Sequence, residues 1–265
     1  MRRLSSLPMA VAPEKKSPRK RSSTNVVSAA RRESRGKRKF DARELLKSLA
    51  IILAIWFTIR TLLVEPYRIP SESMEPTLLV GDFLFVNKLI YGPHIPFTNT
   101  NLPGYGDPKR GSIAVYVSPP QYDQPEDLTP TVVKRLVGIP GDTLYMRDGV
   151  LFVNGIAQRQ GFGTDTFAEG ANETNRDFDW QKKVVLQHSR FGPPPAEPTH
   201  DNWGPFVVPP DHYFGMGDNR YHSKDARYYG FVPRANLRGK PMFIYISFDW
   251  YDWRIRWNRI GHVIR

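Results

Sequence analysis

Hydrophobic residues form one long run near the start of the chain. The run covers residues 45–64, and its charged residues, Lys47 and Arg60, lie near its two ends. A helix over these positions would span roughly 30 Å, about the thickness of the hydrocarbon core of a bilayer. Long charged side chains near the ends of such a helix can reach the polar interface. The pattern predicts a transmembrane helix over residues 44–64.

Two other structures could give the same run. One is a helix buried in the protein core with charged ends. The other is a cleaved signal peptide, which fits less well because the basic region before the run is long and no small-residue cleavage site follows Val64. We therefore favour a membrane anchor.

After Val64 the apolar runs are short and are separated by Gly, Pro and Asp, which is typical of strands and turns. Asp148-Gly149 favours a tight hairpin turn, and Gly81-Asp82 and Gly141-Asp142 each precede an apolar run. No long helical pattern follows, so we expect a mainly β fold, with an antiparallel β-sheet core after the N-terminal helix. The predicted strands are residues 83–86, 112–117, 132–137, 143–145, 150–153, 212–214 and 242–246.

Two segments differ from this pattern. Residues 155–205 are polar and loop-rich, with three consecutive prolines at 193–195. We expect them to form a cap subdomain inserted into a domain that covers residues 65–265. Residues 248–257 combine aromatic side chains with Arg, which suits either a membrane interface or packing between strands.

The formal net charge of +12 belongs almost entirely to the N-terminal tail. Residues 1–43 contain fourteen Lys and Arg against three acidic residues, which gives 14 − 3 = +11 and leaves about +1 for the rest. The tail lacks sustained periodicity, so we expect it to be disordered. The positive-inside rule places it in the cytoplasm and residues 65–265 on the outer face of the membrane. A nucleic-acid-binding arm would carry the same charge, but membrane topology already accounts for it.

The composition limits the possible chemistry. The chain has no cysteine, which excludes disulfides, thiol catalysis and Cys-ligated metal sites. Its six histidines are scattered without a metal-binding spacing, and neither a GxSxG motif nor a Gly-rich phosphate loop occurs. We predict no metal and no cofactor. His222 lies beside Ser223 and near Asp218 and Asp225, but a Ser-His-Asp triad assembles through space, so closeness in sequence is weak support.

Two features remain as candidates for hydrolytic chemistry. Ser71 and Ser73 stand two residues apart in a proline-flanked segment, so in an extended backbone their side chains point to the same side. Lys134 lies among β-branched residues of a predicted strand, where burial would lower its pKa. A neutral amine can take the proton of a serine hydroxyl. Each feature alone also has an ordinary explanation: a turn for the serines and a solvent-exposed lysine in the strand.

Four segments resemble the sequence boxes of bacterial type I signal peptidases. They are residues 70–78 with Gly81-Asp82 (the serine box), 110–115 (the strand box), 133–142 (the lysine box) and 217–230 (the last box). They occur in the order of that family and span most of residues 65–235. Four matches in sequence are far more specific than any one of them.

The resemblance implies that Ser73 is the nucleophile and Lys134 the general base. It also implies an oxyanion hole made by the Ser71 hydroxyl and the Ser73 backbone N–H. Ser223 would orient Lys134 by a hydrogen bond, and two further residues would form a supporting ion pair. That pair is Asp225 with Arg227.

The same resemblance implies a small apolar substrate pocket and an Ala-x-Ala preference before the cut. The precursor would lie extended and add a strand to a sheet edge. Glu72, where glycine is usual, and Tyr221-His222, where Asp-Asn is common, depart from the family pattern without removing a catalytic group. The pocket walls would lie near Tyr67, Ile69, Leu78 and Val133.

The function that follows is that of a membrane-bound serine endopeptidase that removes signal peptides from exported precursor proteins. Its partners would be these precursors and membrane lipid, near the secretion translocon, with no nucleic acid. We place it in the bacterial inner membrane, although an Arg- and Ser-rich start would also suit a mitochondrial or plastid protein. A self-cleaving repressor of the Ser-Lys type would need an N-terminal DNA-binding domain. A membrane-tethered binding or scaffold protein is the alternative from a different class.

Overall fold

The computed structural model describes residues 42–95, 98, 100–120, 129–158 and 173–265. The predicted disordered tail over residues 1–43 therefore lies outside the described residues, except for its last two. The chain divides into two compact units, residues 1–50 and 51–265. The described part of the first unit is the beginning of a helix. The second unit holds the rest of that helix and all the strands described below.

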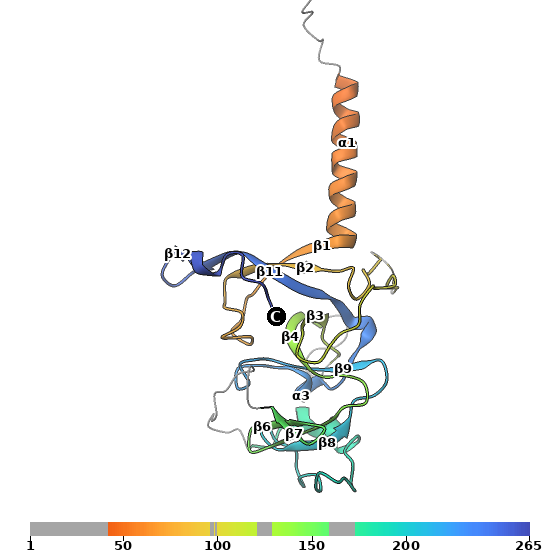
Figure 1. Ribbon diagram of the computed structural model, residues 1–265, viewed down its shortest axis with the longest axis vertical. Helices are drawn as coiled ribbons and strands as arrows, with labels where there is room; N and C mark the ends of the chain where they lie inside the picture. Colours follow the sequence, from red (N-terminus) through yellow and green to blue (C-terminus); the bar gives the residue numbers. More distant parts are fainter. Residues whose placement is uncertain (1–41, 96–97, 99, 121–128, 159–172) are drawn as a thin grey trace, which may run out of the picture. The chain divides into compact units, whose positions relative to one another are not determined.

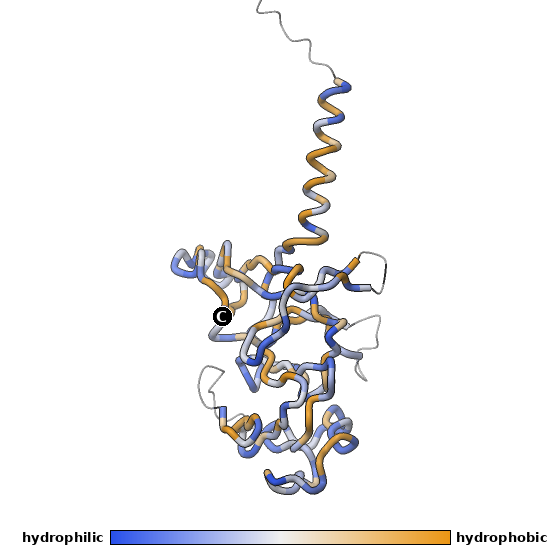
Figure 2. The backbone as a smooth tube through the Cα atoms, turned by 45° about the vertical axis from the view of Figure 1, so that its right-hand side comes forward, coloured by the Kyte–Doolittle hydropathy of each residue, from blue (hydrophilic) through white to orange (hydrophobic). Residues whose placement is uncertain are grey.

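Helix α1 (Ala42–Thr58) continues as a π-helix over Ile59–Leu63. None of the α1 side chains is buried, and its large apolar side chains are exposed. Figure 2 shows hydrophobic colouring along its middle turns. Within the described residues, no helix is both long and apolar enough to cross a bilayer. The helix predicted over residues 44–64 is thus present as far as Leu63, and its passage through a membrane stays a prediction.

The larger of two sheets has eight strands. They are β1 (Val64–Arg68), β2 (Asp82–Asn87), β3 (Ile113–Val117), β4 (Thr131–Gly138), β9 (His212–Met216), β10 (Val232–Pro233), β11 (Leu237–Asp249) and β12 (Arg254–Ile255). Their order is β1-β2-β11-β3-β4-β9-β10, with β12 paired to β11. All pairs are antiparallel, and Figure 1 shows β1, β2 and β11 running side by side.

The smaller sheet has four antiparallel strands. They are β5 (Thr143–Arg147), β6 (Val150–Val153), β7 (Ile156–Gln158) and β8 (Trp203–Val207), in the order β7-β6-β5-β8. Asp148 and Gly149 join β5 to β6 with φ angles of 49° and 75°, so the predicted hairpin turn is confirmed. Glycine adopts this left-handed backbone without a steric cost, which suits it to the second position of the turn.

Short helices connect some of these strands. Residues 173–202 run from β7 towards β8 and contain a 3-10 turn and a single α-helical turn. Another single turn follows β9, and two 3-10 turns flank β11 and β12. These elements are η4 (Arg176–Phe178), α2 (Asp179–Lys182), α3 (Ala226–Tyr229), η5 (Arg234–Asn236) and η6 (Trp257–Arg259).

The predicted mainly β fold is confirmed, and all seven predicted strands are present. Five strands escaped the sequence pattern, namely β1, β7, β8, β10 and β12. Strands β7 and β8 begin inside the segment 155–205, which the pattern marked as loop-rich. Gly204 and Pro205 stand in the middle of β8, and both residue types weaken a strand signal because they are rare in strand interiors.

A shared hydrophobic cluster joins the two sheets. Trp203 and Phe206 of β8 pack with Phe214 and Met216 of β9. The Trp203 and Phe214 ring centroids lie 5.5 Å apart, within the range of favourable aromatic pairs. Strand β9 leads directly into the last sequence box, residues 217–230. The small sheet therefore rests on the strand that delivers this box to the centre of the unit.

Candidate active site

The serine segment forms a tight turn between β1 and β2. Backbone N–H groups of Glu75 and Leu78 donate to the carbonyls of Glu72 and Met74, each at 2.9 Å. Met74 and Leu78 are buried in the core. They hold the turn so that its serine side, described next, faces outward.

The two serine hydroxyls lie on the same side of this turn. The Oγ atoms of Ser71 and Ser73 are 3.5 Å apart, with Ser71 exposed and Ser73 half-buried. The sequence predicted this shared side from an extended backbone, whereas the structure produces it in a turn.

Lys134 is buried in the middle of β4, with only 4% of its surface exposed. Burial lowers its pKa to about 8, because the charged ammonium loses more hydration energy on burial than the neutral amine does. The Asp225 carboxylate raises this pKa, and the Arg227 guanidinium lowers it. About a tenth of the amine is therefore neutral at pH 7, far more than for a lysine with an ordinary pKa, and a general base acts in this neutral form.

A buried ion pair fastens the serine segment to β4. Arg135 donates to both carboxylate oxygens of Asp218, at 2.8 and 2.7 Å, and Thr77 Oγ1 donates to the same carboxylate at 2.6 Å. Arg259 Nη2 donates to the Thr77 carbonyl at 2.9 Å from the other side. Because Arg135 follows Lys134 directly, these contacts fix the serine turn relative to the lysine strand.

Gly217 is the point where the serine segment meets the last box. The Asn219 N–H donates to the Ser73 carbonyl at 3.2 Å. A Cβ atom on residue 217 would lie 2.2 Å from Ser223 Oγ and 2.4 Å from the Ser73 carbonyl oxygen. Any side chain there would separate the two serines, so glycine is needed for this close approach.

Asp225 is the centre of the hydrogen-bond network behind Lys134. Its carboxylate accepts from the Ser223 hydroxyl at 2.7 Å, from the Gly217 N–H at 3.0 Å and from two Arg227 guanidinium nitrogens at 2.9 Å each. Burial raises the pKa of Asp225, but the Arg227 charge and hydrogen bonds outweigh this, and with Lys134 and the Gly217 N–H they lower it to about 2. The carboxylate is therefore ionised at any pH at which an enzyme of this kind works.

Ser223 has a different first partner from the one that the family resemblance implies. The Ser223 hydroxyl donates its hydrogen bond to Asp225, and the lone pairs on the Ser223 oxygen can accept a further hydrogen bond. Asp225 and Arg227 do form the implied ion pair, and both side chains are fully buried.

The four expected pocket residues pack in one cluster with Met74. Ile69 and Leu78 are buried, whereas Tyr67 and Val133 are half-buried. Tyr67 and Val133 therefore keep part of their surface open, whereas Ile69 and Leu78 are covered within the same cluster.

Strand β4 is paired on both edges along only part of its length. Strand β3 pairs with it from Thr131 to Arg135, whereas β9 pairs with it only from Arg135 to Gly138. In the described part of the chain, the β9-side edge of residues 131–134 has no strand beside it. This open edge ends at Lys134.

Comparisons with known proteins give the family. A family model described as "Signal peptidase, peptidase S26" matches residues 42–246. Signal peptidase I of Pseudomonas fluorescens is 36% identical over 216 residues, which cover 76% of this chain and 71% of that protein. Signal peptidase I of Buchnera aphidicola is 35% identical over 263 residues, covering 82% of each chain. This chain belongs to the signal peptidase family, peptidase S26.

A second Pseudomonas relative gives the same result. Signal peptidase I of Pseudomonas aeruginosa is 36% identical over 220 residues, covering 78% of this chain and 72% of that protein. A crystal structure of a signal peptidase I from Enterococcus faecalis V583 is 28% identical and covers 51% of this chain and 96% of its own, with a TM-score of 0.30, too low for a comparison of folds. The family resemblance seen in the four boxes is confirmed by the sequence matches.

Several residues of this signal peptidase site were not picked out from the sequence. Arg135 adjoins the lysine and received no role from the sequence, yet it is buried against Asp218. Arg259 and His200 lie outside the four boxes, and each reaches a box residue only through the fold. His222 is exposed and bonds to Asn219, so it takes no part in a triad.

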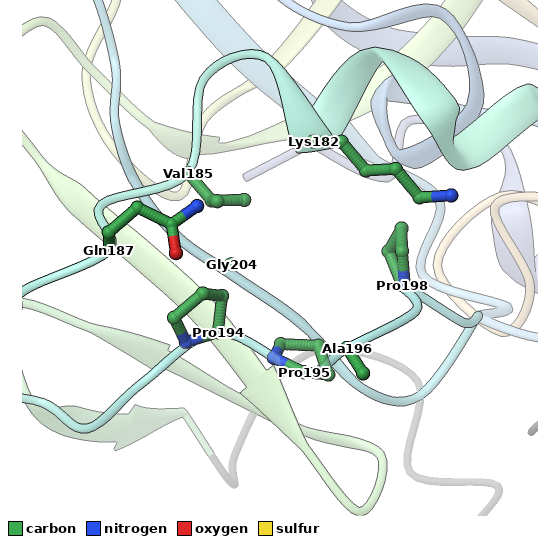
Figure 3. A pocket seen from close by; sticks show the side chains of 8 residues that line it. All are labelled: Lys182, Val185, Gln187, Pro194, Pro195, Ala196, Pro198 and Gly204. Carbon is green, nitrogen blue, oxygen red and sulfur yellow. The ribbon is translucent and has the colours of Figure 1, made fainter.

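The same signal peptidase chain has a separate cavity of about 330 Å³ between α2 and β8. Figure 3 shows Val185, Gln187 and Pro194 around it. Its charged side chain, Lys182, is exposed and ion-paired to Asp179. The cavity holds no serine or buried base, so it is not the hydrolytic site. Across the described residues, no group of three or more His, Asp or Glu side chains is arranged to hold a metal ion.

Proposed function

We propose that this member of the signal peptidase family is a membrane-bound endopeptidase that removes signal peptides from exported precursor proteins, with Ser73 as nucleophile and Lys134 as base. Its relatives bear the name Signal peptidase I. The observation that carries the proposal is the buried Lys134, whose pKa is about 8, on a strand fixed to the serine turn.

The reaction begins with the neutral Lys134 amine taking the proton of Ser73 as its Oγ attacks the scissile carbonyl. The Ser71 hydroxyl and the Ser73 N–H donate to the oxyanion that develops. The Lys134 ammonium then gives its proton to the leaving amine, which departs with the mature protein. Water attacks the remaining ester, Lys134 takes the proton of that water, and the released Ser73 alkoxide is reprotonated by the ammonium.

The Asp225 network supports the base. The Ser223 hydroxyl donates a hydrogen bond to Asp225, so the Ser223 oxygen can accept a hydrogen bond from Lys134 and orient the amine. Arg227 balances the Asp225 charge, which prevents the carboxylate from holding Lys134 as an ammonium.

The open edge of β4 explains how a precursor binds. An extended chain can pair with residues 131–134 and bring its scissile bond to Lys134 at the end of that edge. Tyr67 and Val133 then meet the side chains that precede the cut. Because the cluster beneath is filled by Ile69 and Leu78, only small residues fit, which gives the Ala-x-Ala preference.

Membrane attachment completes the proposal. The exposed apolar side chains of α1 suit a bilayer, with the basic tail in the cytoplasm and residues 65–265 outside, as in a periplasmic enzyme of the bacterial inner membrane near the translocon. The β11–β12 turn and the following η6 add exposed aromatic side chains, since Tyr251 and Trp253 of the turn are 96% and 77% exposed and Trp257 of η6 is 74% exposed. Such rings favour the headgroup region of a membrane. We assign the described residues 155–158 and 173–205 to the predicted cap; the rest of the predicted segment, residues 159–172, lies outside the described residues.

The test is cleavage of a purified precursor by the full chain in detergent, with products identified by mass spectrometry. Wild type should make a single cut after a small residue. Ser73→Ala and Lys134→Ala should abolish it, whereas Lys183→Ala, which changes an exposed lysine, should leave it intact. Cutting that survives Ser73→Ala would overturn the proposal. No cut by the wild type would favour a membrane-tethered binding protein instead.

A further inference from the structure

One side chain from the segment between β7 and β8 enters the last sequence box. His200 is 8% exposed, and its Nε2 atom meets the guanidinium of the fully buried Arg227. We propose that His200 is a positioning residue that holds Arg227 against Asp225. In this way it favours the neutral form of the Lys134 amine. This inference rests on the proposed function, in which Lys134 is the base.

The guanidinium of Arg227 has a dedicated acceptor on each side. Its Nε and Nη2 atoms donate to Asp225 at 2.9 Å each, and Nη2 also donates to the Arg220 carbonyl at 2.6 Å. Its Nη1 atom donates to His200. A buried guanidinium that loses an acceptor leaves a donor unsatisfied in a site without water access, which favours a shift of the group.

Asp201 fixes His200 in the tautomer that can accept. Arginine only donates, so the Nε2 atom of His200 must carry a lone pair, and the ring proton must be on Nδ1. The Asp201 carboxylate lies 2.6 Å from that Nδ1 and accepts a hydrogen bond from it. The Arg220 carbonyl also lies 2.9 Å from Nε2, but a proton on Nε2 would face the Arg227 Nη1 donor, and this carbonyl has its own donor in Arg227 Nη2.

Tyr221 locks this pair in place. Its ring stacks on the imidazole of His200 at 4.9 Å between centroids, and its hydroxyl donates to Asp201 at 3.1 Å. Tyr221 is one of the two residues that depart from the usual family pattern in the last box. In this chain its partner, Asp201, comes from outside the boxes.

The consequence for the base follows from the charges around it. The charged groups that act on Lys134 are Asp225 and Asp218, which favour the ammonium, and Arg227, which opposes it. If Arg227 moves away from Asp225, the carboxylate acts on Lys134 with less compensation. The ammonium is then favoured, and less neutral base is present at a given pH. The groups around His200 itself are Arg227, Asp201, Tyr221 and the Arg220 carbonyl.

The experiment measures kcat/KM for precursor cleavage against pH with the full chain in detergent. Two variants remove the acceptor by different routes. His200→Ala deletes it, and Asp201→Asn keeps the shape but offers an amide N–H to Nδ1, which turns the ring proton towards Arg227. His200→Gln restores an acceptor oxygen, and His188→Ala changes an exposed histidine of the same segment.

We expect the acid limb of the profile to move to higher pH by about one unit in His200→Ala and Asp201→Asn, with an about tenfold loss of kcat/KM at pH 7. His200→Gln should recover most of the rate, and His188→Ala should match wild type. An acid limb that stays in place in Asp201→Asn would overturn the inference, and this variant decides the matter if His200→Ala does not fold. Failure of the proposed function is a separate outcome, since wild type would then not cut or Ser73→Ala would still do so.

Discussion

Replacing Lys134 by Met offers a direct measure of what its burial costs. Methionine has a similar length and is apolar, so it removes the amine while filling the same space. The folded chain holds the pKa of Lys134 at about 8, against an ordinary value of 10.5. That difference corresponds to about 3 kcal/mol of destabilisation wherever the amine is protonated in both the folded and the unfolded chain.

The penalty depends on pH in a direction set by the lowered pKa. Between about pH 8 and 10.5 the unfolded chain binds more protons than the folded chain, so rising pH stabilises the fold. Wild type should bear about 3 kcal/mol of this penalty at pH 7 and about 2 kcal/mol at pH 9. The stability of wild type should therefore rise by about 1 kcal/mol relative to Lys134→Met across this range, whatever constant the change in packing adds.

Urea unfolding of the full chain in detergent, followed by tryptophan fluorescence at pH 7, 8 and 9, measures this difference. Lys183→Met, at an exposed position, is the matched control and should track wild type at each pH. The buried tyrosines Tyr116 and Tyr229 have raised pKa values, titrate above this range and are common to all three proteins. A difference between wild type and Lys134→Met that does not change with pH would refute the reasoning, because it would mean that the amine does not titrate between these pKa values.

Four further outcomes can be checked. Below about pH 8, kcat/KM for precursor cleavage should fall about tenfold per pH unit as Lys134 protonates, and a flat profile down to pH 6 would contradict a lysine base. Ser71→Ala should lower kcat by about 10²-fold with little change in KM, as measured by steady-state kinetics, because it removes one oxyanion donor. Asp218→Asn should destabilise the fold by about 3 kcal/mol in urea unfolding, since it leaves the buried guanidinium beside it without its counter-charge. Trp253→Ala combined with Trp257→Ala should slow cleavage of a membrane-embedded precursor in lipid vesicles while leaving cleavage of a soluble peptide unchanged, since only the former depends on how the domain rests on the bilayer.

The mainly β fold could be predicted because its strands carry ordinary signals. Strand β2 alternates buried and half-buried residues along its length, and Asp148-Gly149 marks the turn between β5 and β6. Strand β8 could not be predicted, because Gly204 and Pro205 occupy its centre and its burial comes from packing on β9. Its place in the sheet depends on the tertiary fold more than on local preference.

The residues of the candidate site also fall into those that the sequence could assign and those that it could not. Ser73 and Lys134 stand inside recognisable boxes, so the resemblance assigns them roles before any geometry is known. His200 and Arg259 lie in segments with no box, and their contacts with Arg227 and Thr77 join positions far apart in sequence. No local pattern predicts such contacts, because the fold alone brings these residues together.

If precursors pair with the open edge of β4 as proposed above, this half-paired strand limits which proteins can be cut. Main-chain hydrogen bonds to residues 131–134 do not depend on the side chains of the bound segment. Pairing with this edge therefore requires an extended conformation but no particular sequence. In a folded domain the backbone donors and acceptors are already paired with one another, so they cannot form hydrogen bonds with this edge. Under the binding mode proposed above, the strand would separate unfolded segments from folded ones. A mature domain that has folded outside the membrane would then be spared even where its surface displays two alanines at the right spacing.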